Sequence, residues 1–302
     1  MNKGLLDIES LNRAEIEAIL ARARHFQPAE NETYRRLETL RGKMIVNLFF
    51  EASTRTRVSF EIAARRLGAE TISIAAQGSS VSKGESLVDT LNTLVAMRPN
   101  AIVMRHAASG APHFLARHLA IPIVNAGDGT HEHPTQALLD ALTILDRRKS
   151  LEHLRVAIIG DIAHSRVARS NVHLLSRFGA DIVLCGPPSL LPRELGQLAP
   201  GVRLAYDLPE AIRDADVIMM LRVQLERQHE APMAAGEYFR FYGLRLEHLE
   251  LAKPEVIVMH PGPINRGREL SSEVADSQRS VILNQVENGV AVRMAVLERT
   301  LT

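Results

Sequence analysis

The sequence contains only one cysteine and no long apolar run, and these two features limit the classes of protein to which it can belong. Cys185 has no second cysteine with which to form an internal disulfide, and its place in the apolar run DIVLCG indicates a core thiol. A membrane-spanning helix needs about 18 consecutive apolar residues, and the sequence has no such stretch. The acidic, amphipathic N-terminus differs from a signal peptide, so we expect a cytoplasmic protein with no membrane partner.

An excess of charge of one sign is also lacking, because 36 lysines and arginines face 35 aspartates and glutamates, a formal net charge of +1. This balance gives no bulk field that would attract nucleic acid, so we expect no nucleic-acid partner, and any anion site must be local. The strand-like run RVAIIGD (155–161) is not followed by G-x-G-x-x-G, which argues against a dinucleotide site.

The 302 residues exceed what one core usually fills, so two domains are expected. Short apolar runs rich in β-branched residues alternate with helical patterns. The predicted strands are 44–50, 70–75, 101–105, 121–125, 155–161, 181–186, 216–221 and 256–260. The predicted helices include 54–67, 85–97, 166–178 and the connector 134–148. Near-continuous apolar strands separated by amphipathic helices predict an α/β fold with two doubly wound parallel-sheet domains.

Polar and cationic residues follow the predicted strands. In doubly wound sheets, ligands bind outside the carboxyl ends of the strands. At those positions the sequence presents Arg, His, Ser, Thr and Gln, in segments 51–57, 105–106, 126–136, 161–166, 222–224 and 260–263. Both halves of the chain therefore carry the composition of a cleft for anionic, oxygen-rich ligands.

The segment EASTRTR (51–57) has the features of an anion site. Ser53 can cap the following helix, whose first-turn N–H groups and positive dipole end attract an anion. Arg55 adds a permanently charged, forked donor suited to phosphate, and the hydroxyls of Thr54 and Thr56 complete the cradle. Taken alone, the same run also fits a capped helix with solvated arginines. The other polar strand ends weigh against that simpler interpretation.

STRTR (53–57) followed by SFE (59–61), together with HPTQALLD (133–140), resembles the aspartate/ornithine carbamoyltransferase family over essentially the whole chain. Members transfer the carbamoyl group of carbamoyl phosphate to an amine. Three further segments resemble the branch that uses L-aspartate: SSVSKGES (79–86), RVQLER (222–227) and HPGPINR (260–266). The resemblance implies a transferase of one-carbon groups that makes N-carbamoyl-L-aspartate and phosphate, an early step of de novo pyrimidine biosynthesis, with no cofactor.

The resemblance also implies a role for each matched position. The residues implied in carbamoyl phosphate binding are Ser53, Thr54, Arg55, Thr56, Ser79, Lys83, Arg105, His133, Gln136, Pro261 and Gly262. Those implied in aspartate binding are Lys83, Arg166, Arg222 and Gln224, and the implied catalytic set is Arg55, Thr56, Arg105, His133 and Lys83. Gly262-Pro263 matches a cis-proline turn, although leucine is common at the position of Gly262. No metal site is expected, because HEHP (131–134) has no accompanying thiolate or paired acid motif.

Domain roles and assembly follow from the same resemblance. Residues 1–146 are expected to bind carbamoyl phosphate, with helix 284–302 packing on them, and residues 147–283 to bind aspartate. In the family, the loop that contains Lys83 enters the neighbouring subunit's site, which implies a homotrimer with shared active sites. The sequence leaves open whether a regulatory or dihydroorotase-like partner chain associates.

Two alternatives stay open at this point. A family member that uses ornithine or another amine would bring a cationic co-substrate to Arg166 and Arg222, and the repulsion disfavours it. A ligand-binding or scaffolding relative without turnover would keep the fold, but every residue matched to the family's site is present here.

Overall fold

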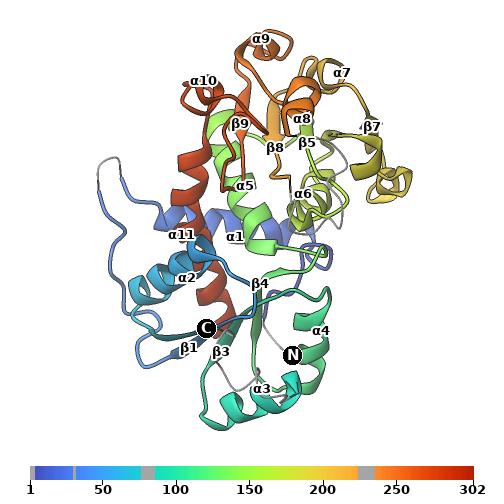
Figure 1. Cartoon of the computed structure of the whole chain (residues 1–302). Helices are drawn as coiled ribbons and strands as arrows, with labels where there is room; N and C mark the ends of the chain where they lie inside the picture. The colour runs from blue at the N-terminus through green and yellow to red at the C-terminus, as the bar shows by residue number, and fades with distance from the viewer. Residues whose placement is uncertain (1–3, 30–31, 76–85, 224–234) are drawn as a thin grey trace. The chain divides into compact units, whose positions relative to one another are not determined.

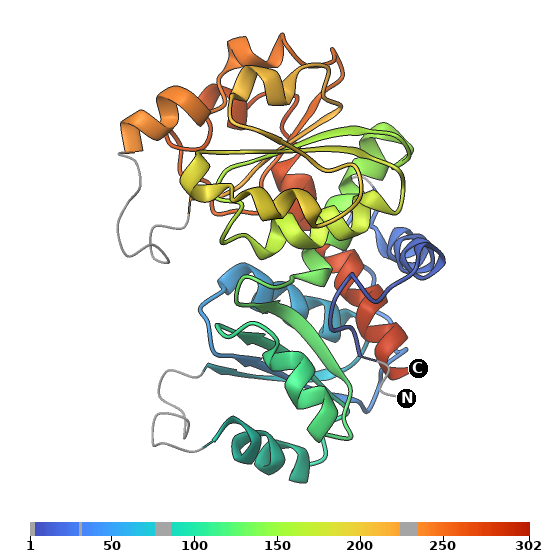
Figure 2. The same ribbon diagram turned by 90° about the vertical axis from the view of Figure 1, so that its right-hand side faces the viewer.

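The computed structural model describes residues 4–29, 32–75, 86–223 and 235–302. It divides into two compact units, one formed by Met1–Leu142 with Val286–Thr302 and the other by Thr143–Gln285. Each unit contains its own parallel sheet, and helices lie on both faces of each sheet (Figure 1, Figure 2). This arrangement confirms the predicted α/β fold of two parallel-sheet domains.

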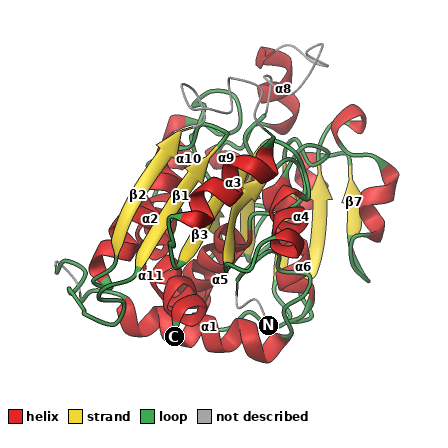
Figure 3. Cartoon of the chain, turned by 90° about the horizontal axis from the view of Figure 1, so that it is seen from below, coloured by secondary structure: helices red, strands yellow, loops and turns green. Residues whose placement is uncertain are grey.

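The first unit is built on a four-stranded sheet with the order β2-β1-β3-β4, in which every neighbouring pair is parallel. The strands are β1 (Met44–Phe49), β2 (Glu70–Ala75), β3 (Ala101–His106) and β4 (Ile123–Asp128). The inner strands β1 and β3 are mostly buried, whereas β2 lies at the edge and exposes four of its six residues. Figure 3 shows β2, β1 and β3 side by side. Apolar runs with β-branched residues fill the inner positions because both of their faces are covered.

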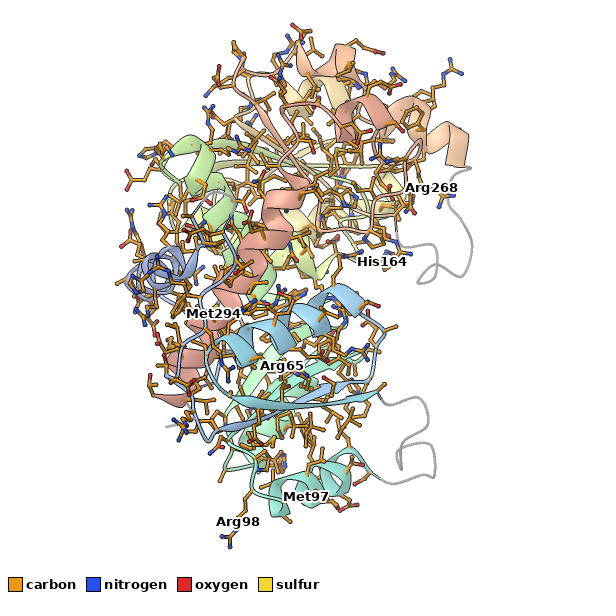
Figure 4. All side chains as sticks on the ribbon, turned by 90° about the vertical axis from the view of Figure 1, so that its left-hand side faces the viewer. Arg65, Met97, Arg98, His164, Arg268 and Met294 are labelled. Atoms are coloured by element: carbon orange, nitrogen blue, oxygen red, sulfur yellow. The ribbon has the colours of Figure 1, made fainter. Side chains whose placement is uncertain are left out.

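The helices of the first unit surround this sheet. They are α1 (Arg13–Phe26), α2 (Thr54–Arg66), α3 (Leu87–Ala96), α4 (Ala111–His118), the start of α5 (Pro134–Arg148) and most of α11 (Ile282–Leu301). The C-terminal helix α11 contacts α2 through a hydrogen bond of 2.8 Å from Arg293 Nη1 to Ser59 Oγ. Met294 of α11 is buried and is labelled with Arg65 of α2 in Figure 4. The expected return of the C-terminal helix to the first domain is thereby confirmed.

The second unit is built on a five-stranded parallel sheet with the order β7-β6-β5-β8-β9. Its strands are β5 (Arg155–Ile159), β6 (Asp181–Cys185), β7 (Arg203–Ala205), β8 (Val217–Met220) and β9 (Ile257–Met259). Its helices are α6 (Arg166–Ser176), α7 (Leu208–Ile212), α8 (Ala235–Tyr242), α9 (Leu246–Leu249) and α10 (Ser272–Ala275), with short 3-10 turns at Pro188–Leu190 and Arg193–Gln197. A cluster of buried hydrophobic residues, which includes Cys185, forms the core of this unit. Burial raises the pKa of the Cys185 thiol to about 12, which agrees with the predicted core thiol.

Some elements escaped the sequence reading. Strand β7 has three residues and begins with an exposed arginine, so its apolar pattern is too short to be recognised. Helix α4 begins after Gly110, which has a φ of +82°, and its first turn contains a proline. Among the described residues, no helix combines the length and apolar character that crossing a membrane would require.

Candidate active site

The start of α2 follows the carboxyl end of β1 directly, so the STRT segment stands at the edge of the first sheet. Ser53 occupies the N-cap position, and its carbonyl accepts a hydrogen bond of 3.1 Å from the N–H of Arg57. The expected side-chain cap was wrong, because among the described residues the Ser53 hydroxyl makes no capping bond to the helix. Thr56 is buried, whereas Thr54 and Arg55 are exposed. The first turn of α2 therefore presents backbone N–H groups, hydroxyls and a guanidinium on one edge.

Arg105 lies beside this helix start because β3 pairs with β1 in a register that places Arg105 opposite Phe49. Its side chain is 11% exposed, and its Nη2 donates to Glu51 Oε1 over 2.8 Å. The Arg105 Nη1 group also contacts the carbonyl oxygen of Ala126 at 3.3 Å, at the end of β4. The Arg105 guanidinium therefore connects β1, β3 and β4 near their carboxyl ends. Its positive charge is paired with the carboxylate of Glu51.

His133 and Gln136 are brought to the same edge by the turn that links β4 to α5. Both side chains are buried, and the N–H of Gln136 donates to the His133 carbonyl over 2.9 Å. The Gln136 Nε2 group donates to Asp140 Oδ1 over 2.9 Å, one helical turn further along α5. Since Asp140 is fully buried and its carboxylate only accepts, this bond orients the Gln136 amide with Oε1 as its acceptor end.

A buried cation lies near Asp140. Arg293 of α11 stands 5.1 Å above the centre of the Phe60 ring and donates to Ser59. Burial lowers the pKa of Arg293 to about 10, and the charge of Asp140 acts against that shift. Arg293 therefore places a positive charge within electrostatic reach of Asp140, behind the Gln136 amide.

Two buried carboxylates, those of Asp128 and Glu132, stabilise the turn that carries His133 through hydrogen bonds. The sequence analysis did not identify either of them. Asp128 accepts hydrogen bonds of 2.8 Å from Asn125 Nδ2 and 3.1 Å from the N–H of Glu132. Glu132 in turn accepts from the N–H of Ile8 at 3.0 Å and of Glu9 at 3.2 Å. The only signal in the sequence was an acidic residue between two histidines, since its partners lie more than 120 positions away.

The second sheet presents its polar residues at the ends of neighbouring strands. The β5 strand runs into Gly160 and then to Ser165, which caps α6 by accepting from Ala168 N–H over 3.1 Å. Arg166, the first residue of α6, is 5% exposed. Leu221 precedes Arg222 and donates its N–H to Ile159 of β5 over 2.7 Å. The pairing of β5 with β8 thus sets Arg166 and Arg222 at the same edge.

A close approach of backbone explains Gly160 in that loop. Its φ is +142°, and an added Cβ would lie 2.9 Å from the carbonyl oxygen of Leu221. Next to it, His164 Nδ1 contacts Asp161 Oδ1 at 2.7 Å (His164 is labelled in Figure 4). The loop before Arg166 is therefore packed against the end of β8.

The end of β9 leads into the segment His260–Pro263, whose Gly262–Pro263 bond is cis, as the family resemblance implied. The N–H of Gly262 donates to His260 Nδ1 over 2.8 Å. The N–H of His260 donates to Gln285 Oε1 over 2.9 Å. These bonds give the turn a defined geometry at the sheet edge.

Glu269 joins the Arg222 loop to the segment that follows this turn, and the sequence reading missed it. Its Oε1 accepts from Val223 N–H at 3.2 Å and Asn265 Nδ2 at 2.7 Å, and its Oε2 accepts from Asn265 N–H at 2.9 Å. The side chain is fully buried, and burial raises the pKa of its carboxyl above the usual value. Its main partners lie 46 and 4 positions away, so only the folded chain identifies this role.

The candidate residues therefore form one set in each unit. The first unit brings together Ser53, Thr54, Arg55, Thr56, Arg105, His133 and Gln136. The second unit brings together Arg166, Arg222, Pro261 and Gly262. Ser79, Lys83 and Gln224 lie outside the described residues.

One further group of side chains has the composition of a metal site, although none was expected. His113, Asp128 and His131 each offer a ligand atom, and these atoms lie within 4.8 Å of one another. The His131 Nδ1 to Asp128 Oδ2 distance is 3.1 Å, and this hydrogen bond raises the pKa of His131. The group lies in the first unit, and His131 belongs to the turn that carries His133.

Comparison with known proteins gives the same family for both units. Residues 3–146 match the model "Aspartate/ornithine carbamoyltransferase, carbamoyl-P binding domain", and residues 152–300 match its "Asp/Orn binding domain". The aspartate carbamoyltransferase catalytic subunit of Solibacter usitatus is 79% identical over 301 residues, which cover 100% of both chains. That of Geotalea daltonii is 54% identical over 98% of this chain and 95% of that protein.

Solved structures agree with these matches. Aspartate transcarbamoylase from Trypanosoma cruzi in complex with carbamoyl phosphate and aspartate has a TM-score of 0.91 and 33% identity, over 100% of this chain and 97% of that one. Ornithine carbamoyltransferase from Pyrococcus furiosus has a TM-score of 0.88 and 30% identity, over 98% of this chain and 96% of that one. On the strength of its two sheets, its polar strand ends and these matches over nearly the whole sequence, the chain belongs to the aspartate/ornithine carbamoyltransferase family.

Proposed function

We propose that the chain is an aspartate carbamoyltransferase that transfers the carbamoyl group of carbamoyl phosphate to the amine of L-aspartate. The products are N-carbamoyl-L-aspartate and phosphate, and the reaction is an early step of de novo pyrimidine biosynthesis. The observation that carries the proposal is the placement of Arg166 and Arg222 at adjacent strand ends, in a chain 79% identical to a catalytic subunit of this name. Two guanidinium groups suit the two carboxylates of aspartate.

Carbamoyl phosphate binding is assigned to the first unit. The helix start at Ser53–Thr56 and the side chain of Arg55 bind the phosphate, because backbone N–H groups and a forked cation match its oxygens. Arg105 reaches the phosphate and the carbonyl region once phosphate oxygens replace Glu51 as its partner. His133 donates to the carbamoyl oxygen, and Gln136 accepts from the carbamoyl amine.

The hydrogen bond from Gln136 to Asp140 supports this last assignment. An amide side chain can present either its oxygen or its nitrogen, and the wrong end would face the carbamoyl NH₂ with a second donor. Asp140 Oδ1 accepts a hydrogen bond of 2.9 Å from Gln136 Nε2, so Gln136 Oε1 is the atom left to accept from the substrate. This orientation supports Gln136 as the acceptor for the carbamoyl amine.

Aspartate binding is assigned to Arg166, Arg222 and Gln224 of the second unit. Arg166 and Arg222 pair with the carboxylates. The carbonyls of Pro261 and Gly262, which the resemblance also places against carbamoyl phosphate, hold the attacking amine. The cis turn and its bond from Gly262 N–H to His260 support a carbonyl-presenting role for this segment.

The chemistry is an acyl transfer. The neutral amine of aspartate attacks the carbamoyl carbon, and the carbonyl electrons move onto the oxygen to give a tetrahedral oxyanion. Arg55, Thr56, Arg105 and His133 stabilise that charge, which is the largest contribution in most reactions of this type. The carbon–oxygen bond to phosphate then breaks, and the leaving phosphate takes the amine proton. No cofactor or covalent enzyme intermediate is required.

The active enzyme is proposed to be a cytoplasmic homotrimer with shared sites. Ser79 and Lys83 of one subunit would complete the site of its neighbour. The two substrates bring about four negative charges when the aspartate amine is neutral. Arg55, Arg105, Arg166 and Arg222 supply four positive charges, which balance the substrates, and a borrowed Lys83 would add a fifth that favours their binding.

Phosphate release separates this function from its alternatives. The purified chain is incubated with carbamoyl phosphate and either L-aspartate or L-ornithine, and phosphate and the carbamoylated amino acid are measured. We expect turnover with aspartate and none above background with ornithine, whose cationic side chain is repelled by Arg166 and Arg222. Turnover with ornithine alone would assign the other branch, and release with neither amine would indicate a binding protein without catalysis.

Mixed subunits test the shared site. Arg55→Ala and Lys83→Ala chains are each expected to be nearly inactive as pure proteins. When they are unfolded, mixed and refolded together, some interfaces pair an intact Arg55 with an intact Lys83, so activity should return in part. Mass spectrometry of the mixed oligomers checks that exchange occurred, and no recovery after confirmed exchange would contradict the shared arrangement.

A further inference from the structure

Four polar side chains from distant parts of the sequence meet in the first unit. Asp7 comes from the N-terminal segment, His113 from α4, Asp128 from the end of β4 and His131 from the turn that follows it. One ligand atom from each of His113, Asp128 and His131 lies within 4.8 Å of the others. None of the four is used in the proposed reaction, so their convergence needs its own explanation.

Two imidazoles and one carboxylate form a ligand set that suits Zn²⁺ and similar divalent transition metals. Bonds from Zn²⁺ to nitrogen and oxygen are about 2.0–2.2 Å long, so two ligand atoms on one ion lie roughly 3–3.5 Å apart. His131 Nδ1 and Asp128 Oδ2 are separated by 3.1 Å. This pair already has the spacing of two ligands on one ion.

The third ligand is oriented by a carboxylate. His113 Nε2 contacts Asp7 Oδ2 at 2.5 Å, and Asp7 Oδ1 accepts from the N–H of Ser10 at 2.6 Å. The other ring nitrogen of His113, Nδ1, is buried and has no hydrogen-bond partner among the described residues. A carboxylate on one ring nitrogen and a metal on the other is the usual arrangement of a ligating histidine.

The surroundings favour a cation at this point. Asp128 is fully buried and anchored by Gly110 N–H at 2.6 Å as well as by its bonds to Asn125 and Glu132. Asp7, Asp128 and Glu132 bring three carboxylates into a small, mostly buried volume. The side chains of His113 and His131 are 28% and 35% exposed, so one side stays open to an entering ion and its water ligand.

We propose that His113, Asp128 and His131 bind one divalent transition metal ion of the Zn²⁺ type, with Asp7 as a positioning residue for His113. The ion takes the place of the proton between His131 and Asp128, and that proton passes to solvent. The bound ion joins the N-terminal segment, α4 and the turn that carries His133, so it stabilises the first unit rather than entering the reaction.

Metal titration of the full-length chain tests this site. The protein is stripped with a chelator, dialysed, and titrated with ZnCl₂ by calorimetry and with CoCl₂ by visible absorption. We expect one ion per chain and the intense visible bands of tetrahedral Co²⁺. His113→Ala and His131→Asn should abolish stoichiometric binding, and Asp7→Asn should weaken it by about 10–100-fold, the usual effect of losing an outer partner of a ligand.

The control is His118→Asn, because His118 is an exposed histidine on the same helix as His113 but outside the cluster. It should bind one ion as the unchanged chain does. Circular dichroism verifies that each variant is folded, and Zn²⁺ should raise the Tm of the unchanged chain and of His118→Asn but not of His131→Asn. Absence of stoichiometric binding to the unchanged chain would show a proton-bridged cluster only and overturn the proposal. Binding by both ligand variants with the same affinity as the unchanged chain would place the ion elsewhere and overturn it as well.

Discussion

In the first unit the candidate binding residues stand on helix starts, whereas in the second most of them stand on loops that a buried carboxylate joins. Ser53–Thr56 begins α2 and His133 immediately precedes α5, each directly after a strand. Arg222 and Gly262 belong to loops after β8 and β9, and Glu269 links Val223, which follows Arg222, to Asn265, which follows the Gly262–Pro263 turn. The two units thus position their proposed anion-binding residues at a sheet edge in different ways.

The difference matches the ligand proposed for each unit. Phosphate is compact and symmetrical, so backbone N–H groups at a helix start recognise it without a precise side-chain geometry. Aspartate is extended and presents two carboxylates and an amine at fixed separations, so its contacts must come from separate side chains and carbonyls. Loops can place those groups individually, but they then need an internal support such as Glu269.

The largest effect is expected from Arg55→Ala in the first unit. Loss of a donor that stabilises phosphate and oxyanion should lower kcat by at least about 100-fold. The matched control is Arg65→Ala, an exposed arginine in the last turn of the same helix, which should keep the normal rate. Steady-state phosphate release measures both, and an unchanged kcat for Arg55→Ala would remove this residue from the mechanism.

The support in the second unit is tested by Glu269→Gln. Glutamine replaces one of the two acceptor oxygens with an NH₂ group, which then faces a backbone N–H without a partner. An unpaired buried polar group costs about 1–3 kcal/mol, so the KM for aspartate should rise by about 10-fold while the KM for carbamoyl phosphate stays constant. Glu273→Gln, at an exposed glutamate nearby, is the control.

Glu269 also predicts a pH dependence. Because burial raises the pKa of its carboxyl, the group takes up a proton at a higher pH than an ordinary glutamate does. As the pH falls through that raised value, the protonated oxygen can no longer accept, and the KM for aspartate should increase. The Glu269→Gln variant should lack this acid-side increase, and an identical profile in both proteins would argue against a role for Glu269 in holding the loops.

A smaller effect is expected from Asp140→Asn behind Gln136. Asparagine still offers an oxygen to Gln136 Nε2, but the bond loses its charge, a difference of about 1 kcal/mol. We expect kcat/KM for carbamoyl phosphate to fall about 5-fold, with Asp146→Asn on the same helix as the control. Gln136→Ala combined with Asp140→Asn should be no worse than Gln136→Ala alone, and full additivity would show that Asp140 does not act through Gln136.

The smallest effect on activity is expected from Asp216→Asn, at the end of β8 opposite to Arg222. Asp216 accepts from the N–H of Arg155 at 3.0 Å and from Lys253 Nζ at 2.7 Å. Burial tends to raise the pKa of Asp216, but these bonds hold it below the usual value. The substitution should lower the free energy of unfolding by about 1–3 kcal/mol and leave the KM for aspartate unchanged.

The pH dependence of that loss has a definite sign. A carboxyl whose pKa is lower in the folded chain than in the unfolded chain stabilises the fold at any pH above its unfolded pKa of about 3.8. This stabilisation is lost as the pH falls through the lowered pKa of the folded chain. Denaturant unfolding at pH 7 and at low pH should therefore show a difference between the two proteins that shrinks in acid. A difference that is independent of pH would exclude the ionised carboxyl as its source.

Much of the first unit's site was readable in the sequence because its signals are local. The STRTR run follows an apolar strand and begins a helix within a few residues, so the rule about carboxyl ends of strands located it. The expected Ser53 cap was nonetheless wrong. A capping bond depends on the φ and ψ of one residue, and the φ of −160° and ψ of 87° at Ser53 depart from the usual cap geometry.

The supporting residues were not readable in the same way. Glu132 binds the N–H groups of Ile8 and Glu9, and Glu269 binds that of Val223, across separations of 46 to 124 positions. The group of His113, Asp128 and His131 was missed for a similar reason, since the HEHP segment contains His131 but does not show that His113 and Asp128 lie beside it.

Sequence alone determined the class of the fold, the alternation of strands and helices, and which residue types lie at the strand ends. These features depend on apolar periodicity and on chain neighbours, both of which are local. Only the tertiary structure decided which buried carboxylate supports which loop, how the Gln136 amide is oriented and where the histidines meet. Such contacts arise when strand pairing and helix packing bring distant segments together, and no local pattern encodes those distances.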